Sequence, residues 1–210
     1  MIKKEIYPKT IRIKEAGAKV QITEKLDGSN LVIFKLNDKL HIAQRKTIME
    51  LDELESNKQG LYKGLYQWII DNKDSLDLHE GSAICGEWLG MGYLKYNIDE
   101  FDKKFYMFAK ANIDDTYTLT NLMYDHDLFI YPFESQEIPK CIGIVPVVAE
   151  IQVIPTKEHL DSIYTKYCEK VKRNVEGFVI NYNNIISKYV RMKNGKIVEY
   201  SENDHKGEDK

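Results

Sequence analysis

The stretch Glu24-Lys25-Leu26-Asp27-Gly28-Ser29-Asn30 is the one around which the chain is organised. Residues 19–25 alternate polar and apolar side chains, which is the period of a half-buried strand. This alternation places Lys25 on the polar face at the end of the strand. Asp27-Gly28 favours a tight turn, because glycine adopts positive φ at little cost, and the apolar residues 31–36 predict a second strand behind it.

Two interpretations of Lys25 follow from this stretch alone. In the first, it is a solvated lysine at an ordinary hairpin corner. In the second, it is a nucleophile, and a lysine amine must be deprotonated to attack, which requires desolvation or positive charge nearby. The second interpretation predicts that cationic and carboxylate partners lie downstream, at the ends of other strands.

Length and composition limit the possible folds but do not indicate a function. The chain has 210 residues, 43% of them hydrophobic, which is enough to bury one good core. We predict one domain over residues 1–200 and a disordered polar tail over 201–210, which has no apolar area to bury. The net charge of −3 excludes a globally basic nucleic-acid binder and leaves only a local basic groove.

The sequence also predicts the compartment. Cys85, Cys141 and Cys168 are odd in number and lack CxxC spacing, so we expect reduced thiols in a cytoplasmic protein. The N-terminal residues are too polar for a signal peptide, and no apolar run is long enough to span a bilayer. The five histidines show neither HxxxH nor HxxE spacing, which disfavours a zinc site.

Many short strands and few helices are expected along the chain. The alternating runs predict strands over 19–25, 31–36, 39–45, 82–90, 105–110, 147–154, 176–182 and 185–193. Helical spacing and capping signals predict helices over 60–72, 118–129 and 157–171. Hairpin turns are expected at Asn37-Asp38 and Asn194-Gly195, and the first three strands should form one antiparallel group around Lys25.

Glu87 is an acid in the middle of an otherwise apolar strand, with Gly86 and Gly90 beside it. A carboxylate in such a strand normally faces water. Glycine in a strand often marks the close approach of another backbone or of a ligand, so Glu87 is also a candidate ligand contact. The aromatic residues of 105–108 have two interpretations as well, because they either belong to the core or stack on a planar base.

Basic residues give two candidate phosphate sites. Lys166, Lys170 and Arg173 share one face of the last predicted helix, which is either a solvated stripe or a phosphate contact. Arg191 and Lys193 lie two positions apart and therefore on one face of a predicted strand. Like charges in this arrangement repel each other, so they are best explained by an anion between them.

In their order along the chain, these segments resemble the ATP-dependent RNA ligases of the covalent nucleotidyltransferase superfamily, the phage-type RNA ligases. The matching segments are the nucleophile motif at 24–30, a phosphate-binding Arg45, the third motif at 86–90, the adenine-stacking segment at 105–108, the fourth motif at 176–180 and the fifth at 191–193. Asn30 favours the RNA ligases, because DNA ligases and capping enzymes of the superfamily more often have arginine there.

The resemblance implies an α+β fold, a nucleotidyltransferase (adenylyltransferase) domain in which two antiparallel sheets with flanking helices form the nucleotide pocket. It implies that Lys25 attacks ATP to form a covalent lysyl-AMP, that the AMP passes to an RNA 5′-phosphate, and that a 3′-hydroxyl then attacks. The implied catalytic residues are Lys25, Arg45, Arg191 and Lys193, the nucleotide contacts are Glu24, Asn30, Glu87, Phe108 and Lys193, and the ligands of Mg²⁺ or Mn²⁺ are Glu176 and Asn30.

The chain departs from the family pattern in two respects. The fifth motif is usually Lys-x-Lys but here is Arg191-x-Lys193, with Lys188 as an alternative register. Nothing after Lys193 could build the C-terminal domain that most members carry, so we expect either a protein partner that replaces it or joining of pre-adenylylated ends only. Equal sealing of 5′-phosphate and 5′-adenylylated RNA would contradict this. The alternative functions are a catalytically degenerate ATP-binding module and a DNA nick-sealing ligase.

Overall fold

The computed structural model describes residues 20–49, 51–56, 63–90 and 92–198, and these fall into two compact units. Unit 1 contains the described residues between Asp27 and Val145, and unit 2 contains those up to Leu26 and from Pro146 onwards. The chain therefore passes from one unit to the other directly after the Glu24-Lys25 stretch. The predicted domain boundaries, 1–200, stay a prediction, and the predicted tail lies outside the described residues.

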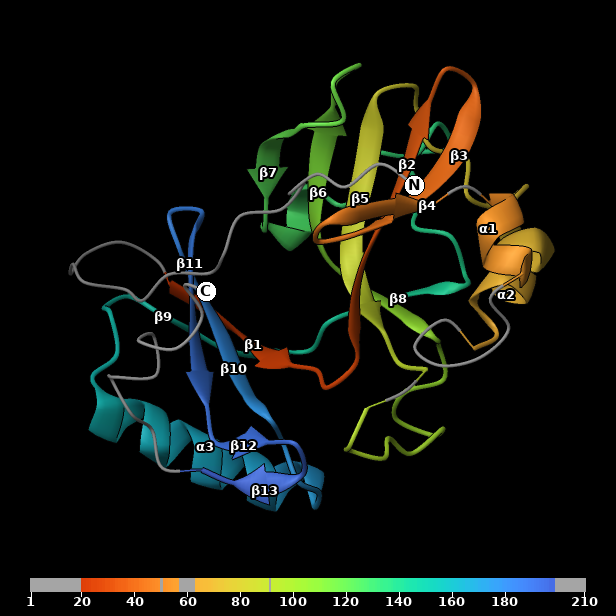
Figure 1. The fold of residues 1–210 in the computed structure, drawn as a ribbon. Helices are drawn as coiled ribbons and strands as arrows, with labels where there is room; N and C mark the ends of the chain where they lie inside the picture. The colour runs from red at the N-terminus through yellow and green to blue at the C-terminus, as the bar shows by residue number, and fades with distance from the viewer. Residues whose placement is uncertain (1–19, 50, 57–62, 91, 199–210) are drawn as a thin grey trace, which may run out of the picture. The chain divides into compact units, whose positions relative to one another are not determined.

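Unit 2 is a four-stranded antiparallel sheet with strand order β11-β10-β1-β9 and one long helix (Figure 1). Its elements are β1 (Val20–Lys25), β9 (Val147–Ile151), α3 (Lys157–Val171), β10 (Gly177–Tyr182), β11 (Ile185–Val190), β12 (Met192–Lys193) and β13 (Lys196–Ile197). Ile22 and Phe178 from the sheet pack with Leu160 of α3 in its core. The alternation predicted before Lys25 is confirmed as β1, and the predicted helix 157–171 is confirmed with those bounds.

Helix α3 begins and ends with recognisable capping groups. Thr156 has extended backbone, and its hydroxyl oxygen accepts the backbone N–H of His159 at 3.3 Å. At the other end, Lys172 adopts the left-handed region with φ 54° and donates its backbone N–H to the carbonyl of Cys168. These groups fix the point at which the chain leaves α3 for Arg173 and β10.

Thr156→Ala is expected to lower the free energy of unfolding by about 1 kcal/mol, because it removes the acceptor for an otherwise unpaired N–H at the helix start. Thr165→Ala is the matched control, since Thr165 Oγ1 donates to the carbonyl of Asp161 within the same helix at 3.0 Å, a bond that competes with the helix backbone. Urea unfolding followed by circular dichroism would measure both variants. Equal losses would contradict the capping role.

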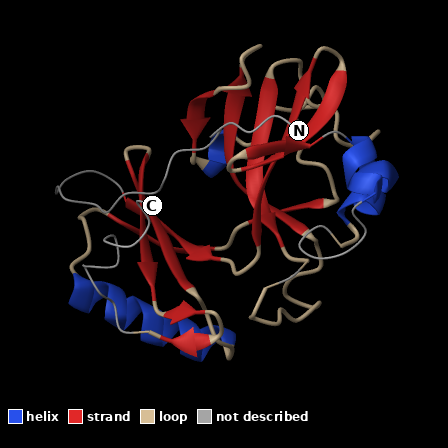
Figure 2. Cartoon of the chain, viewed as in Figure 1, coloured by secondary structure: helices blue, strands red, loops and turns tan. Residues whose placement is uncertain are grey.

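Unit 1 is built mainly of strands, drawn red in Figure 2. Its larger sheet is mainly antiparallel with strand order β4-β3-β2-β5-β6-β7, and β8 pairs parallel to β6 (Figure 1). Its elements are β2 (Ser29–Leu36), β3 (Lys39–Gln44), β4 (Thr47–Met49), α1 (Leu51–Ser56), α2 (Leu65–Asn72), β5 (Ser82–Trp88), β6 (Phe105–Ile113), β7 (Leu119–Met123), the 3-10 helix η2 (His126–Leu128) and β8 (Ile142–Ile144). Leu31 and Ile33 pack on the α1 and α2 side, whereas Val32 and Phe34 pack on the other face.

The two-residue turns match the hairpins predicted from sequence. Asn37-Asp38 has φ values of 53° and 56° and joins β2 to β3, and Asn194-Gly195 has φ values of 52° and 73° and joins β12 to β13. Both positions of such turns require positive φ, which asparagine, aspartate and glycine tolerate. Asn183-Asn184, with φ values of 47° and 65°, forms a third turn of this kind between β10 and β11.

The predicted grouping of the first three strands around Lys25 is wrong. β2 and β3 do pair with each other, but β1 pairs with β10 and β9 in the sheet of unit 2. Asp27-Gly28 is therefore a connection between two sheets and not a hairpin turn. Within unit 1, Asp27 is held by its backbone N–H, which donates to Tyr96 Oη at 2.6 Å, and by Oδ2, which accepts the backbone N–H of Leu94 at 2.7 Å.

The predicted helix over 118–129 is also wrong, because this segment forms β7 and η2. The helical spacing of Leu119 and Leu122 comes from a β-bulge. Asn121 has φ 50°, and the register against β6 shifts between Lys110 and Asn112. The extra residue lets two leucines three positions apart pack against the same core. Thr118, which resembles a helix cap, belongs to a turn and donates its backbone N–H to Asp114.

Two further predictions concern the three cysteines and membrane-spanning segments. All three cysteines are free, and burial raises the pKa of the Cys85 thiol to about 12. Burial also raises the pKa of Cys141 and of Cys168. Within the described part of the chain, no helix has the length and apolar character needed to cross a bilayer. The predicted 60–72 helix is confirmed over Leu65–Asn72 as α2, whereas Lys63 and Gly64 form a turn before it, and residues 60–62 lie outside the described residues.

Candidate active site

Lys25 and Glu176 form an ion pair at one end of the sheet in unit 2. Lys25 is the last residue of β1 and lies opposite Gly177, the first residue of β10. Lys25 Nζ donates to Glu176 Oε1 at 2.6 Å. The Lys25 side chain is 28% exposed and that of Glu176 is 16% exposed, so the pair is partly screened but reachable from solvent. The structure thus brings together two candidate residues that are 151 positions apart.

Backbone hydrogen bonds bring the Arg191 segment to the same place. The carbonyl oxygen of Glu176 accepts the N–H groups of both Arg191, at 2.8 Å, and Met192, at 3.0 Å. Gly177 permits this close approach, because a Cβ on it would lie 2.0 Å from the carbonyl oxygen of Tyr189. Three sequence-distant candidates, Lys25, Glu176 and Arg191, are therefore fixed by one set of strand ends.

The side chain of Glu24 points to the opposite face of the sheet from that of Lys25. It shares the α3 face with Ile22, and its side chain is 0% exposed. Arg173 binds it with two bonds, Nη1 to Oε1 at 2.6 Å and Nη2 to Oε2 at 2.7 Å, and Tyr167 Oη donates to Oε2 at 2.8 Å. The Glu24 carboxylate is thus bound by two side chains of unit 2, and its predicted contact with a nucleotide stays a prediction.

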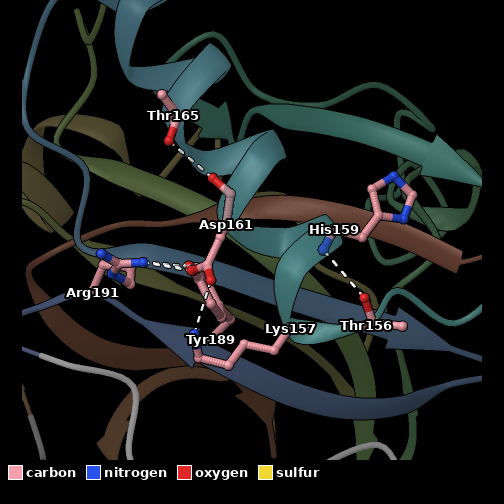
Figure 3. A network of polar contacts seen from close by, with 7 residues as sticks. All are labelled: Thr156, Lys157, His159, Asp161, Thr165, Tyr189 and Arg191. Carbon is pink, nitrogen blue, oxygen red and sulfur yellow. Dashed lines mark hydrogen bonds and ion pairs between the residues drawn. The ribbon is translucent and has the colours of Figure 1, made fainter.

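Arg191 also has a carboxylate partner within unit 2 (Figure 3). Its Nη1 donates to Asp161 Oδ1 on α3 at 2.5 Å and to Tyr189 Oη at 3.0 Å, and its guanidinium lies over the ring of Tyr164. The hydroxyl of Tyr189 donates to the same Asp161 oxygen. The predicted continuous strand through Arg191 and Lys193 is wrong, because β11 ends at Val190. Asp161 is the anion that offsets the Arg191 charge.

These contacts shift the ionisation of the network. The hydrogen bonds from Tyr189 and Lys157 lower the pKa of Asp161. Burial, followed by the hydrogen bond to Asp161, raises the pKa of Tyr189 to about 12. The hydrogen bond with Tyr189 raises the pKa of Arg191 above its already high value. At neutral pH the network therefore holds an aspartate, a neutral tyrosine and a guanidinium.

Asp161 is expected to make stability depend on pH in the acidic range. Because its pKa is lower in the folded chain, its contribution is complete above the ordinary aspartate pKa of about 4 and is lost as the pH falls through the folded-state pKa. Asp161→Asn should therefore be less stable than wild type at pH 7, and the difference should shrink below about pH 4. Urea unfolding at both pH values would measure this. A difference that grows in acid would contradict it.

In unit 1, Asn30 and Glu87 lie directly opposite each other on neighbouring strands, β2 and β5. Side chains opposite each other in an antiparallel pair share a face, and this face also carries Val32 and Cys85. Glu87 Oε1 accepts the backbone N–H of Gly28 at 3.2 Å. Asn30 Oδ1 is buried and has no hydrogen-bond partner among the described residues. An oxygen in this state is suited to a ligand.

Phe108 and Arg45 belong to the same unit. Phe108 is the bulged residue of β6, since Cys85 pairs with Ala109 and the next residue, Gly86, pairs with Met107. A bulge redirects a side chain, and Phe108 packs against the face that carries Val32. Arg45 follows the end of β3, and its buried Nε has no partner among the described residues, so it can receive an anion.

The glycines beside Glu87 have a structural explanation. A Cβ on Gly86 would lie 2.4 Å from the ring of Phe105, and one on Gly90 would lie 2.2 Å from the indole nitrogen of Trp88. They permit close approach of the protein's own side chains, which is one of the two predicted possibilities. The position of Glu87 opposite Asn30 does not depend on these glycines.

The predicted basic stripe on the last helix is wrong for Arg173. This residue lies beyond the end of α3, and its guanidinium faces Glu24. Lys166 and Lys170 remain exposed on the helix, as a solvated stripe would be. Lys193 is exposed as well and lies in β12, opposite Lys196 of β13.

Each unit contributes one predicted metal ligand, Glu176 in unit 2 and Asn30 in unit 1. Among the described residues, no cluster of three or more His, Cys, Asp or Glu side chains could hold a metal. Mg²⁺ keeps several waters and takes one or two carboxylates together with phosphate oxygens. The carboxylate of Glu176 and the unpartnered amide oxygen of Asn30 are ligands of the required type.

Comparison with known proteins identifies the family. A model of the RNA ligase family matches residues 18–193. The chain belongs to the RNA ligase family. No curated protein gives a significant match. The family membership agrees with the resemblance of the motif order, and it confirms the predicted recognition of an RNA ligase.

Solved structures of Naegleria gruberi RNA ligase share the fold of this RNA ligase family member. A mutant without ligand aligns with TM-score 0.52 and 17% identity, over 83% of this chain and 49% of that one. A mutant with ATP and Mn gives 0.55 and 16%, over 83% and 50%, and a mutant with AMP and Mn gives 0.52 and 16%, over 90% and 60%. The chain thus spans about half to three-fifths of those ligases. The α+β class is confirmed, and the predicted two-sheet pocket stays a prediction.

Sequence reasoning missed the groups that hold the candidate residues. Arg173 and Tyr167 bind Glu24, and Asp161 binds Arg191. One signal was available for the first of these, because Glu24 has the same parity along β1 as the apolar Val20 and Ile22. A charged side chain in that position needs a buried partner. No local pattern pointed to Asp161.

Proposed function

We propose that the chain is an ATP-dependent RNA ligase that forms a covalent lysyl-AMP at Lys25. The observation that carries the proposal is the pair formed by Lys25 Nζ and Glu176 Oε1 at 2.6 Å, at the strand ends where the Arg191 backbone also lies. Membership of the RNA ligase family supports the reaction class, and the ATP and Mn in solved Naegleria ligase structures support the substrate and the metal.

In the proposed first step, Lys25 Nζ attacks the α-phosphorus of ATP. A nitrogen–phosphorus bond forms, the bond to pyrophosphate breaks, and the amine loses a proton. Glu176 Oε1 lies within hydrogen-bond distance of that proton. Arg45 and Lys193 are the proposed cationic partners of the phosphates, and Glu87 and Phe108 are the proposed contacts of the nucleoside. In the later steps, AMP passes to an RNA 5′-phosphate and a 3′-hydroxyl displaces it.

A divalent metal ion is proposed to take part in the same reaction. Glu176 and Asn30 are the residues proposed to hold Mg²⁺ or Mn²⁺. When bound, such a cation offsets negative charge on the phosphates and orients them for an in-line attack. The buried, unpartnered oxygen of Asn30 supports this assignment.

Incubation with ATP labelled at the α-phosphate, in the presence of Mg²⁺ or Mn²⁺, tests the proposal. Label is expected on the denatured protein, and ATP labelled at the γ-phosphate should leave the protein unlabelled because that phosphate departs with pyrophosphate. Addition of RNA with a 5′-phosphate tests the later steps: transfer of the label to the RNA, followed by joined product, would show that the chain carries them out without a protein partner. Nicked DNA in place of RNA tests the nick-sealing alternative.

One result would overturn the proposal. If the protein binds ATP saturably but takes no label in the presence of either Mg²⁺ or Mn²⁺, the chain is a nucleotide-binding module without turnover. The ion pair between Arg191 and Asp161 is the observation that favours this second candidate. In this pair the Arg191 guanidinium binds a carboxylate of unit 2 and not a phosphate.

A further inference from the structure

Two successive residues at the end of β1 form ion pairs with one short segment, Arg173–Glu176. Glu24 binds Arg173, and Lys25 binds Glu176. Successive side chains of a strand point to opposite faces, so one pair lies on the α3 face of the sheet and the other on the opposite face. The segment that leads from α3 into β10 is therefore attached to the end of β1 from both sides.

The two pairs differ in burial and in geometry. The side chains of Glu24 and Arg173 are 0% and 13% exposed, whereas those of Lys25 and Glu176 are 28% and 16% exposed. Glu24 receives two parallel bonds from the planar guanidinium and a third from Tyr167. Lys25 is joined to Glu176 by a hydrogen bond from a flexible ammonium. The first pair is thus geometrically fixed, and the second is able to exchange partners.

We propose that Arg173 is a positioning residue for Lys25. By binding both oxygens of Glu24 it fixes the backbone on either side of the Lys25 amine, namely the end of β1 and the residues before Glu176. The amine and its carboxylate partner can then separate for reaction while their backbones stay in place. The inference rests on the function proposed above, because its consequence is the rate of AMP transfer to Lys25.

The test is the single-turnover rate constant for labelling by α-labelled ATP. Arg173→Met should lower this rate constant by roughly 100-fold, the effect of displacing a reacting group by about 1 Å. Arg173→Lys keeps the charge but lacks the planar fork, so it should lose less. Tyr167→Phe removes only the third bond and should lose least. The dissociation constant of a non-hydrolysable ATP analogue should change by no more than about threefold in the Arg173 variants, since the Arg173 side chain is only 13% exposed and its guanidinium is bound to Glu24.

Amplitude and rate constant separate positioning from a purely structural role. If Arg173 only stabilises the fold, Arg173→Met will lower the fraction of protein that takes label and leave the rate constant of that fraction unchanged. Thr156→Ala is the control, because it weakens the start of α3 without touching Glu24 and should keep the wild-type rate constant. A wild-type rate constant in Arg173→Met, or an equal fall in Thr156→Ala, overturns the inference.

A second readout keeps the inference testable if the wild-type protein takes no label and the proposed function fails. Modification of Lys25 by trinitrobenzenesulfonate, measured by mass spectrometry of the Lys25 peptide, reports how firmly the amine is held. Arg173→Met should speed this modification several-fold, because the Lys25–Glu176 pair is no longer fixed. If Arg173→Met folds too poorly to measure, Arg173→Lys serves in its place. An unchanged modification rate overturns the inference.

Discussion

Lys25→Met is expected to abolish covalent labelling by α-labelled ATP, with a loss of more than about 1,000-fold. Methionine keeps an unbranched chain of similar length but has no amine to attack the α-phosphorus, so no nitrogen–phosphorus bond can form. The measurement is label retained on the denatured protein after a fixed time. Lys39→Met is the matched control, since Lys39 is an exposed lysine at the start of β3, and it should label like wild type.

RNA that already carries a 5′-adenylyl group separates loss of the nucleophile from loss of the fold. Joining of such RNA needs only attack by the 3′-hydroxyl and departure of AMP, so Lys25 is not required as the nucleophile. Lys25→Met should therefore still join adenylylated RNA while failing on 5′-phosphate RNA with ATP. Label retained by Lys25→Met would contradict the assignment of the nucleophile, and label lost by Lys39→Met would show that the assay does not report on it.

Patterns that repeat within a single element were enough to predict that element. The alternation up to Lys25 predicts β1, and the apolar face of 157–171 predicts α3 with its observed bounds. The hairpin at Asn37-Asp38 was predictable for the same reason, because both residues tolerate the positive φ that the turn requires. In each case the physical cause lies within a few residues of its effect.

Pairing between distant segments was not predictable from these patterns. Asp27-Gly28 has the composition of a hairpin turn, yet the strand before it pairs with β10, more than 150 residues away, and the strand after it pairs with β5. Leu119 and Leu122 have helical spacing only because Asn121 adopts φ 50° in a bulge. A local pattern cannot distinguish a helix from a strand whose alternation is interrupted once.

The residues of the candidate site also fall into those that the sequence could predict and those that it could not. The motif order indicated Lys25, Glu176, Asn30 and Glu87, and the structure places the first two in contact and the last two in register. The groups that hold them were not indicated. Arg173 is 149 positions from Glu24, and Asp161 is 30 positions from Arg191, so each partner is set by the packing of α3 and not by any local rule.

Arg173→Met is expected to lower the free energy of unfolding by about 3–5 kcal/mol, because it leaves the Glu24 carboxylate buried without its cation. Lys157→Met is the matched control in the same unit. It breaks the Lys157–Asp161 pair, whose side chains are 50% and 32% exposed, and exposed pairs contribute no more than about 1 kcal/mol. Urea unfolding at pH 7 would measure both variants. Equal losses would contradict the view that Glu24 depends on Arg173.

The cost of that substitution arises from the unpaired charge and not from the value of the pair itself, since two ions removed from water gain little net stability from each other. The triple variant Glu24→Met, Tyr167→Phe, Arg173→Met removes every polar group of the contact and should recover most of the lost stability. Recovery in that variant would show that unit 2 does not need this ion pair in order to fold. The reason to keep a buried glutamate directly before Lys25 would then lie in the position of the lysine. If the triple variant were as unstable as Arg173→Met, the pair would instead be a net contributor to the fold.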